Sequence, residues 1–244
     1  MAVLHTQVLE AVAVADNVVS LDLAVPEGMR WKTGEFVRVA LPGASESDWR
    51  CYSIATPSGS NVLRLFVARV KGGAVSPKLC ALKKGDTLMV DTETMGMLLE
   101  NRLQEGGKDL WLFATGTGVA SFVAVASDPT IVEKYDNIVL VHSVRTWSET
   151  QYVGRYITMG PKLQMMACVT REKGALIQKR IPDALSEGLV EKTAGLTLDP
   201  AHSRAMICGN PAMVKSVREA LKARGFVSPR GANPGQMLVE NFWL

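Results

Sequence analysis

The sequence predicts two domains of different class, an N-terminal antiparallel β-barrel and a C-terminal α/β domain with a parallel sheet. Residues 1–97 alternate short β-rich runs with turn residues, as antiparallel domains do. After Gly107, apolar strands alternate with longer helical segments, which indicates a parallel sheet covered by helices on both faces. The 244 residues, 47% of them hydrophobic, suffice for two modest cores. We place the second domain at 98–244, with residues 98–108 as a linker.

The N-terminal domain is predicted from its β-rich runs. A barrel or a sandwich is expected from runs at Gln7–Val14, Val18–Val25, Phe36–Leu41, Leu63–Val70 and Thr87–Val90. A short helix over Ser76–Leu82 is expected at one end, because a Lys-Lys-Gly-Asp turn follows it.

The C-terminal domain is predicted from apolar strands and amphipathic helices. Its strands are expected at Leu110–Ala114, Ile138–Val141, Met165–Val169 and Ala205–Cys208. A helix over Val119–Ala126 follows the first strand. Another helix begins at Pro211 and stops at Gly225, with Asn210 as its N-cap.

Composition excludes several classes of function. The net charge of +3 is too small to predict nucleic-acid binding. No C-x-x-C pair offers a zinc or iron–sulfur site, and no apolar stretch reaches the roughly 20 residues of a membrane span. We therefore expect a monomeric cytoplasmic protein with no metal and four free thiols, at Cys51, Cys80, Cys168 and Cys208.

The run Arg50-Cys51-Tyr52-Ser53 is the densest functional signal of the first domain. In a strand, Arg50 and Tyr52 share one face and Cys51 points the other way. A guanidinium binds phosphate through two parallel hydrogen bonds, and a tyrosine ring can stack on a planar ring. The pair therefore indicates a flavin nucleotide, while the alternative is an exposed arginine beside an ordinary strand tyrosine.

A glycine turn, Lys71-Gly72-Gly73-Ala74-Val75-Ser76, leads directly into the predicted short helix. Such a turn presents free backbone N–H groups, and the positive end of the helix favours a pyrophosphate. The alternative is a hairpin exit turn that only caps the helix.

Two strand-to-helix corners mark a possible nucleotide site in the second domain. Thr115-Gly116-Thr117-Gly118 follows the first strand, although the third glycine of the Rossmann fingerprint is missing and a tight turn without ligand gives the same pattern. Cys208-Gly209-Asn210-Pro211 follows a later strand at the same edge. Its thiol could face a nicotinamide, or it could be a buried structural cysteine.

Three arginines, Arg145, Arg171 and Arg180, follow the later strands and could converge at one sheet edge. Such a cluster suits the 2′-phosphate that distinguishes NADP from NAD, although each arginine alone could be a solvated surface residue. The chain then ends on Glu240-Asn241-Phe242-Trp243-Leu244. Two aromatics at a terminus indicate that a core edge or a cofactor ring holds it.

Taken in order, these motifs resemble the ferredoxin–NADP reductase family, in its bacterial type, over essentially the whole chain. The resemblance implies that Arg50 holds the FAD phosphate, Tyr52 covers the flavin ring and Ser53 lies near its N5 atom. It implies catalytic roles for Tyr52, Ser53, Cys208 and Glu240. The FAD-binding set would be Arg50, Cys51, Tyr52, Ser53, Phe66, Gly73, Ala74, Val75, Ser76, Phe242 and Trp243.

The NADP(H)-binding set that the resemblance implies is Thr117, Arg145, Thr170, Arg171, Arg180, Gly209, Asn210 and Met213. Two positions depart from the family pattern. Ser121 stands where the family usually has proline, and Leu244 follows the aromatic residue that often closes the bacterial chain.

The activity implied is electron transfer between NADP(H) and ferredoxin or flavodoxin through FAD. Exposed lysines near the flavin motifs could steer an acidic carrier, or form a solvated face; they are Lys71, Lys78, Lys83 and Lys84. Two alternatives remain, an NAD(P)H-dependent reductase component for an oxygenase or free flavin, and a non-catalytic nucleotide-binding module.

Overall fold

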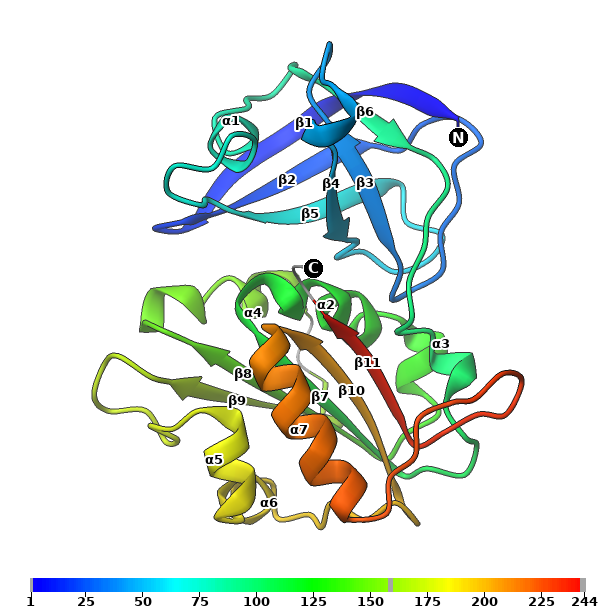
Figure 1. The fold of residues 1–244 in the computed structure, drawn as a ribbon, viewed down its shortest axis with the longest axis vertical. Helices are drawn as coiled ribbons and strands as arrows, with labels where there is room; N and C mark the ends of the chain where they lie inside the picture. The colour runs from blue at the N-terminus through cyan, green and yellow to red at the C-terminus, as the bar shows by residue number, and fades with distance from the viewer. Residues whose placement is uncertain (1, 158–159, 242–244) are drawn as a thin grey trace.

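The computed structural model describes residues 2–157 and 160–241, and it places a β-barrel domain above an α/β domain (Figure 1). The barrel is formed by β1 (Val3–Ala15), β2 (Val18–Ala24), β3 (Phe36–Ala40), β4 (Arg50–Ser53), β5 (Val62–Ala68) and β6 (Thr87–Asp91). All its pairings are antiparallel, in the order β4-β3-β6-β1-β2-β5. The predicted class of the first domain is confirmed.

The sheet of the first domain curls until its two edge strands meet. An antiparallel bridge joins Ile54, just after β4, to Leu65 of β5, and the Ala55 N–H donates to the Arg64 carbonyl. Side chains that alternate along the strands, such as Leu21, Leu23 and Leu63, fill the interior. This closure leaves the end of β4 at the rim that faces the second domain.

The second domain has a fully parallel sheet in the order β11-β10-β7-β8-β9. Its strands are β7 (Asp109–Thr115), β8 (Asn137–Val144), β9 (Leu163–Val169), β10 (Ser203–Gly209) and β11 (Met237–Asn241). The first four confirm the predicted strands, whereas β11 has no counterpart in the sequence prediction. The chain winds from β7 to β9 in one direction and then places β10 on the other side of β7.

Helices cover both faces of this sheet, as predicted. The face toward the barrel carries α2 (Val119–Ala126), α3 (Pro129–Val132) and α4 (Val153–Tyr156). The other face carries α5 (Ile181–Ser186), α6 (Leu189–Ala194) and α7 (Pro211–Ala223). Within β7, Leu110 and Leu112 point into the first layer, and Trp111 and Phe113 into the second. Among the described residues, no helix is long and apolar enough to cross a bilayer.

One expectation needs correction, because the helix expected over Ser76–Leu82 is a single turn, α1 (Ser76–Leu79). The segment predicted as the linker, residues 98–108, is packed in place, since Leu98 is fully buried and Leu103 bridges to Gly235. Arg204 fastens the same segment by donating to the carbonyls of Gln104 and Glu105. The segment therefore fixes the two domains instead of letting them swing.

The two domains share a continuous core. Phe66 of β5 is buried against α4, with its ring centroid 5.1 Å from that of Tyr152 and 5.3 Å from that of Tyr156. At a second point the Thr33 hydroxyl donates to the Asp128 carboxylate, 2.5 Å away. Both contacts are buried, so the interface holds the rim of the barrel in a fixed position over the sheet.

Candidate active site between the domains

Strand β4 presents Arg50 and Tyr52 at the barrel rim. One terminal nitrogen of Arg50, Nη1, donates to the carbonyls of Ser47 and Trp49, at 2.7 and 2.8 Å. The other guanidinium nitrogens have no partner among the described residues, so they can bind an anion. Tyr52 packs half-buried against the barrel core, and burial raises the pKa of its phenol.

Ser53, at the end of β4, has an unsatisfied polar atom. The residue is 2% exposed, and its hydroxyl has no hydrogen-bond partner within the described chain. A buried hydroxyl without a partner is costly, so such a group indicates a ligand that completes it. A flavin ring lying along Tyr52 would supply a polar edge there, and the residues present therefore fit FAD.

The glycine turn lies between β5 and α1. The pKa of Asp48, just before β4, is lowered by hydrogen bonds from Ser45, and further by the cations of Arg50 and Lys78, so Lys78 of α1 lies within electrostatic range of Asp48. Because α1 is one turn long, its dipole adds little. The backbone of the turn offers more, since the N–H groups of Ala74, Val75 and Ser76 have no partner among the described residues.

Ser76 is already used within this turn. Its hydroxyl accepts from the Val70 N–H at 3.0 Å, which shapes the loop around Gly72 and Gly73. A side chain at Gly73 would meet both the Cβ and the carbonyl of Val70 at 3.2 Å. The turn is therefore tightly closed around its free N–H groups, as a pyrophosphate cradle requires.

The two predicted corners of the second domain meet at one point of the sheet. The order in which strands join the sheet reverses at β7, since β8 and β9 lie on one side of it and β10 on the other, and ligands of open α/β sheets bind at such a switch point. The Asn210 N–H donates to the Thr115 hydroxyl at 2.7 Å, which joins the two corners. Asn210 also caps α7 through the N–H groups of Ala212 and Met213, as predicted.

Gly118 allows the corners to come together. A Cβ there would lie 2.8 Å from the Cys208 carbonyl oxygen and 2.9 Å from the Gly209 Cα. Its own φ of −59° is ordinary, so the constraint is steric. Thr117 is half-buried beside it, and the backbone of Cys208 and Gly209 packs directly against Gly118.

We expect Gly118→Ala to destabilise the protein by about 1–3 kcal/mol, because the backbone of Cys208 and Gly209 must move to make room for the added methyl group. Gly154→Ala is the matched control, since Gly154 is also helical and its Cβ would meet nothing within 4 Å. That control should be neutral or slightly stabilising. Urea unfolding of the two variants measures the difference, and equal stability would contradict the proposed crowding.

Cys208 and Glu240 lie side by side on β10 and β11. Burial raises the pKa of the Cys208 thiol well above its usual range, and the Glu240 carboxylate adds to that effect. Cys208 is thus a neutral thiol rather than a reactive thiolate. Burial also raises the pKa of Glu240 to about 7, although the Met97 N–H donates to its Oε2 at 3.1 Å.

Glu240 lies near residues of both domains. Its carboxylate raises the pKa of the Cys51 thiol on β4 of the barrel and the pKa of the Cys208 thiol on β10 of the sheet. The Cys51 thiol is exposed and lies opposite Arg38 on β3, on the face of β4 away from Tyr52. Of the catalytic residues that were predicted separately, Cys208 and Glu240 lie side by side, and Glu240 reaches the first domain through the Met97 N–H. Tyr52 and Ser53 follow Cys51 on β4, and their place beside Cys208 and Glu240 stays a prediction.

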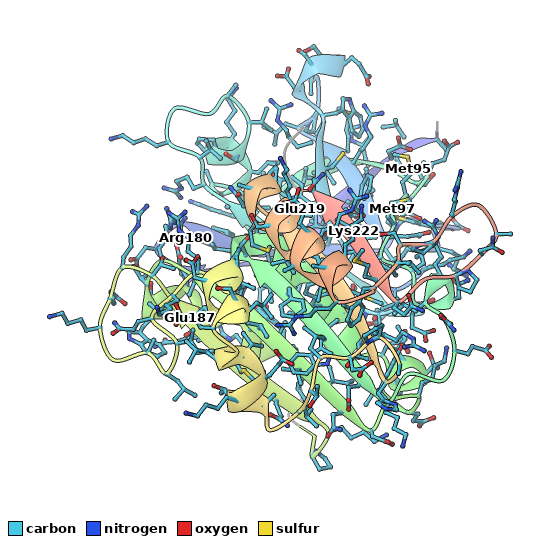
Figure 2. The ribbon with its side chains drawn as sticks, turned by 60° about the horizontal axis from the view of Figure 1, so that its bottom comes forward. Met95, Met97, Arg180, Glu187, Glu219 and Lys222 are labelled. Carbon is cyan, nitrogen blue, oxygen red and sulfur yellow. The ribbon has the colours of Figure 1, made fainter. Side chains whose placement is uncertain are left out.

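The predicted arginines are only partly brought together. The Arg171 N–H donates to the Arg145 carbonyl at 2.9 Å, so these two lie on adjacent loops beyond β8 and β9. Arg145 already forms an ion pair with Glu149, with Nε 3.0 Å from Oε1. The Thr170 hydroxyl donates to the Val144 carbonyl. Arg180 is exposed at the start of α5, across α7 from Met95 and Met97 in Figure 2.

Four further predicted residues lie away from this region or outside the described residues. Phe66 faces the aromatic residues of the domain interface, and Met213 is buried in the core beneath α7. Phe242 and Trp243 lie outside the described residues, as does Leu244. Sequence analysis missed the interface residues Thr33, Asp128, Tyr152 and Tyr156, and no local pattern marks them.

Comparisons with known proteins agree with this geometry. Residues 5–97 match the family model of the oxidoreductase FAD-binding domain. The chain is 35% identical to ferredoxin–NADP reductase of Pseudomonas aeruginosa over 242 residues, which cover 94% of this chain and 93% of the relative. It is 29% identical to flavodoxin/ferredoxin–NADP reductase of Escherichia coli K12 over 234 residues, which cover 93% and 94%.

A solved structure extends the likeness to the whole fold. The ferredoxin NADP+ reductase of Neisseria gonorrhoeae with bound FAD and NADP superposes with a TM-score of 0.91 and 29% identity, and all of both chains is covered. The relatives therefore match both domains of the chain. The chain therefore belongs to the ferredoxin–NADP reductase family.

Proposed function

We propose that this protein is an FAD-dependent oxidoreductase that transfers electrons between NADP(H) and ferredoxin or flavodoxin. The observation that carries the proposal is that Glu240, paired with Cys208 on the sheet, reaches the first domain at Met97 and lies near Cys51 of β4, because a flavin and a nicotinamide must stack between the domains to react. Residues 1–97 would bind FAD and residues 98–244 NADP(H). One chain supplies both half-sites, so a monomer suffices, and its free thiols suit the cytoplasm.

Bound FAD supplies a hydride acceptor at N5 and releases electrons one at a time. The chain supplies orientation. Arg50 and the N–H groups of residues 74–76 would hold the phosphates, Tyr52 would support the ring, and the Ser53 hydroxyl would bind its polar edge. Gly118 and Gly209 would let the two corners pack closely beside the nicotinamide, and Cys208 and the partly buried Glu240 would keep water away from it.

An absorption spectrum of the purified protein, followed by titration with NADPH, tests the proposal. We expect flavin bands that bleach with NADPH and return when oxidised ferredoxin or flavodoxin is added. A protein that stays colourless after FAD is added would instead be a non-catalytic nucleotide-binding module. Bleaching without transfer to either carrier would favour a reductase for an oxygenase or free flavin.

Arg171→Ala should raise the KM for NADPH about tenfold or more and leave the KM for NADH nearly unchanged. Arg171 is exposed with no side-chain partner among the described residues, and the loss of one charge-assisted contact to the 2′-phosphate costs about 1.5–3 kcal/mol. Steady-state dye reduction with both nucleotides measures it. A parallel loss with NADH would remove Arg171 from phosphate recognition and favour an NADH-dependent reductase.

The lysine face allows a test of partner steering. Lys71, Lys78, Lys83 and Lys84 are all exposed around α1. If they attract an acidic carrier, the second-order rate of carrier reduction should fall several-fold between about 50 and 300 mM salt, because screening shortens the range of attraction. NADPH oxidation by a neutral dye is the control. A carrier rate that is independent of salt would rule out steering by this face.

A further inference from the structure

Trp147 is an exposed indole at the carboxyl edge of the parallel sheet. It lies in the loop after β8, two residues beyond Arg145, and is 38% exposed. Large aromatic side chains are usually buried, as Trp111 is in the core of the same domain. The exposure of a tryptophan at this edge of the sheet therefore needs a physical explanation.

Two hydrogen bonds hold the indole in place. The Trp147 backbone N–H donates to the Glu172 carboxylate at 2.5 Å, and its ring Nε1–H donates to the Lys173 carbonyl at 3.3 Å. Both acceptors belong to the loop after β9. No aromatic ring or cation of the described residues stacks on the Trp147 ring. The edge of the ring is fixed while its flat surface stays available.

The same two loops carry the arginines. The backbones of Arg145 and Arg171 are joined at 2.9 Å, and the contacts of Trp147 with residues 172 and 173 follow directly along both loops. Of the nearby carboxylates, Glu149 is paired with Arg145, while Glu172 accepts from the Trp147 N–H and keeps its charge. The Arg171 guanidinium and an aromatic surface are thus combined at one place.

We propose that Trp147 is the stacking platform for the adenine ring of NADP(H), beside a 2′-phosphate bound by Arg171. This inference rests on the proposed function, since it concerns the same nucleotide. An adenosine 2′-phosphate presents a flat aromatic base and a dianion a few ångströms apart, and the two loops offer the matching surfaces. A fixed indole orders the base at a small cost in side-chain entropy.

Calorimetric titration of the FAD-loaded protein with adenosine 2′,5′-bisphosphate tests this assignment without turnover. We expect Trp147→Ala and Trp147→Leu to weaken binding about tenfold, and Trp147→Phe to retain most of the affinity, because stacking needs an aromatic ring. Val227→Ala, at an exposed apolar residue between α7 and β11, is the matched control and should bind as the wild type does.

Kinetics separate stacking from a purely structural role. Trp147→Ala should raise the KM for NADPH about tenfold with kcat nearly unchanged, and should leave the KM for reduced nicotinamide mononucleotide, which lacks adenine, unaltered. Equal losses with both substrates, or loss only in carrier reduction, would overturn the proposal. So would unchanged bisphosphate binding in Trp147→Leu. If the wild type itself does not bind the bisphosphate, both the proposed use of NADP(H) and the stacking role of Trp147 are wrong. If Arg171→Ala loses bisphosphate binding but the Trp147 variants do not, only the stacking role is wrong.

Discussion

Replacing Arg50 with alanine should weaken the binding of FAD about a hundredfold. Only Nη1 of its guanidinium is engaged, by the carbonyls of Ser47 and Trp49, so the remaining donors are available to a phosphate. Two charge-assisted hydrogen bonds to phosphate contribute about 1.5–3 kcal/mol in net terms, and each 1.4 kcal/mol is a factor of ten. Titration of the flavin-free variant with FAD, followed by flavin fluorescence, measures the dissociation constant.

Two variants keep this result interpretable. Arg218→Ala removes an exposed arginine of α7 that has no partner among the described residues, and it should bind FAD as the wild type does. Arg50→Lys retains the charge but not the two-pronged geometry, and should fall between wild type and alanine. If Arg50→Ala stays folded by circular dichroism and keeps its FAD through gel filtration, β4 does not bind the flavin.

Local sequence patterns account for most of the fold. Pro211 after Asn210 predicted the start of α7 correctly, because capping is a short-range interaction. Strand β11 was missed since Met237–Asn241 is short, has no flanking strand signal and pairs only with β10, which is distant in sequence. The helix expected to Leu82 stops at Leu79 because the chain there must turn back toward β6.

In the candidate site, too, local motifs could be predicted from the sequence whereas long-range contacts could not. Each half could be predicted, because Arg50 to Ser53 and Gly116 to Gly118 are contiguous motifs. Their meeting depends on contacts such as the one between Thr33 and Asp128, which are 95 residues apart and which no spacing rule can find. The ion pair of Arg145 with Glu149 could have been predicted from the sequence, since the two residues lie only four positions apart.

Glu240 should make stability depend on pH between about 4.5 and 7. Burial raises its pKa from 4.5 to about 7 in the folded protein. Between these values the folded state keeps a proton that the unfolded chain has released, so the free energy of unfolding must fall as pH rises. The favourable contribution is complete below about pH 4.5 and is lost by about pH 8. A shift of this size corresponds to roughly 3 kcal/mol.

Glu240→Gln, which cannot ionise, isolates this effect. The difference in free energy of unfolding between wild type and variant should decline from pH 5 to pH 8 in urea titrations. His142 has the opposite influence, since burial lowers its pKa to about 4 and stability is lost as the pH falls below 6.5. Because both proteins contain His142, its contribution cancels in the difference. Glu27→Gln, at an exposed glutamate, is the control, and its free energy of unfolding should depend on pH as that of the wild type does. A flat difference for Glu240→Gln would mean that its carboxylate is ionised and solvated in the fold, and that β11 does not close the site against water.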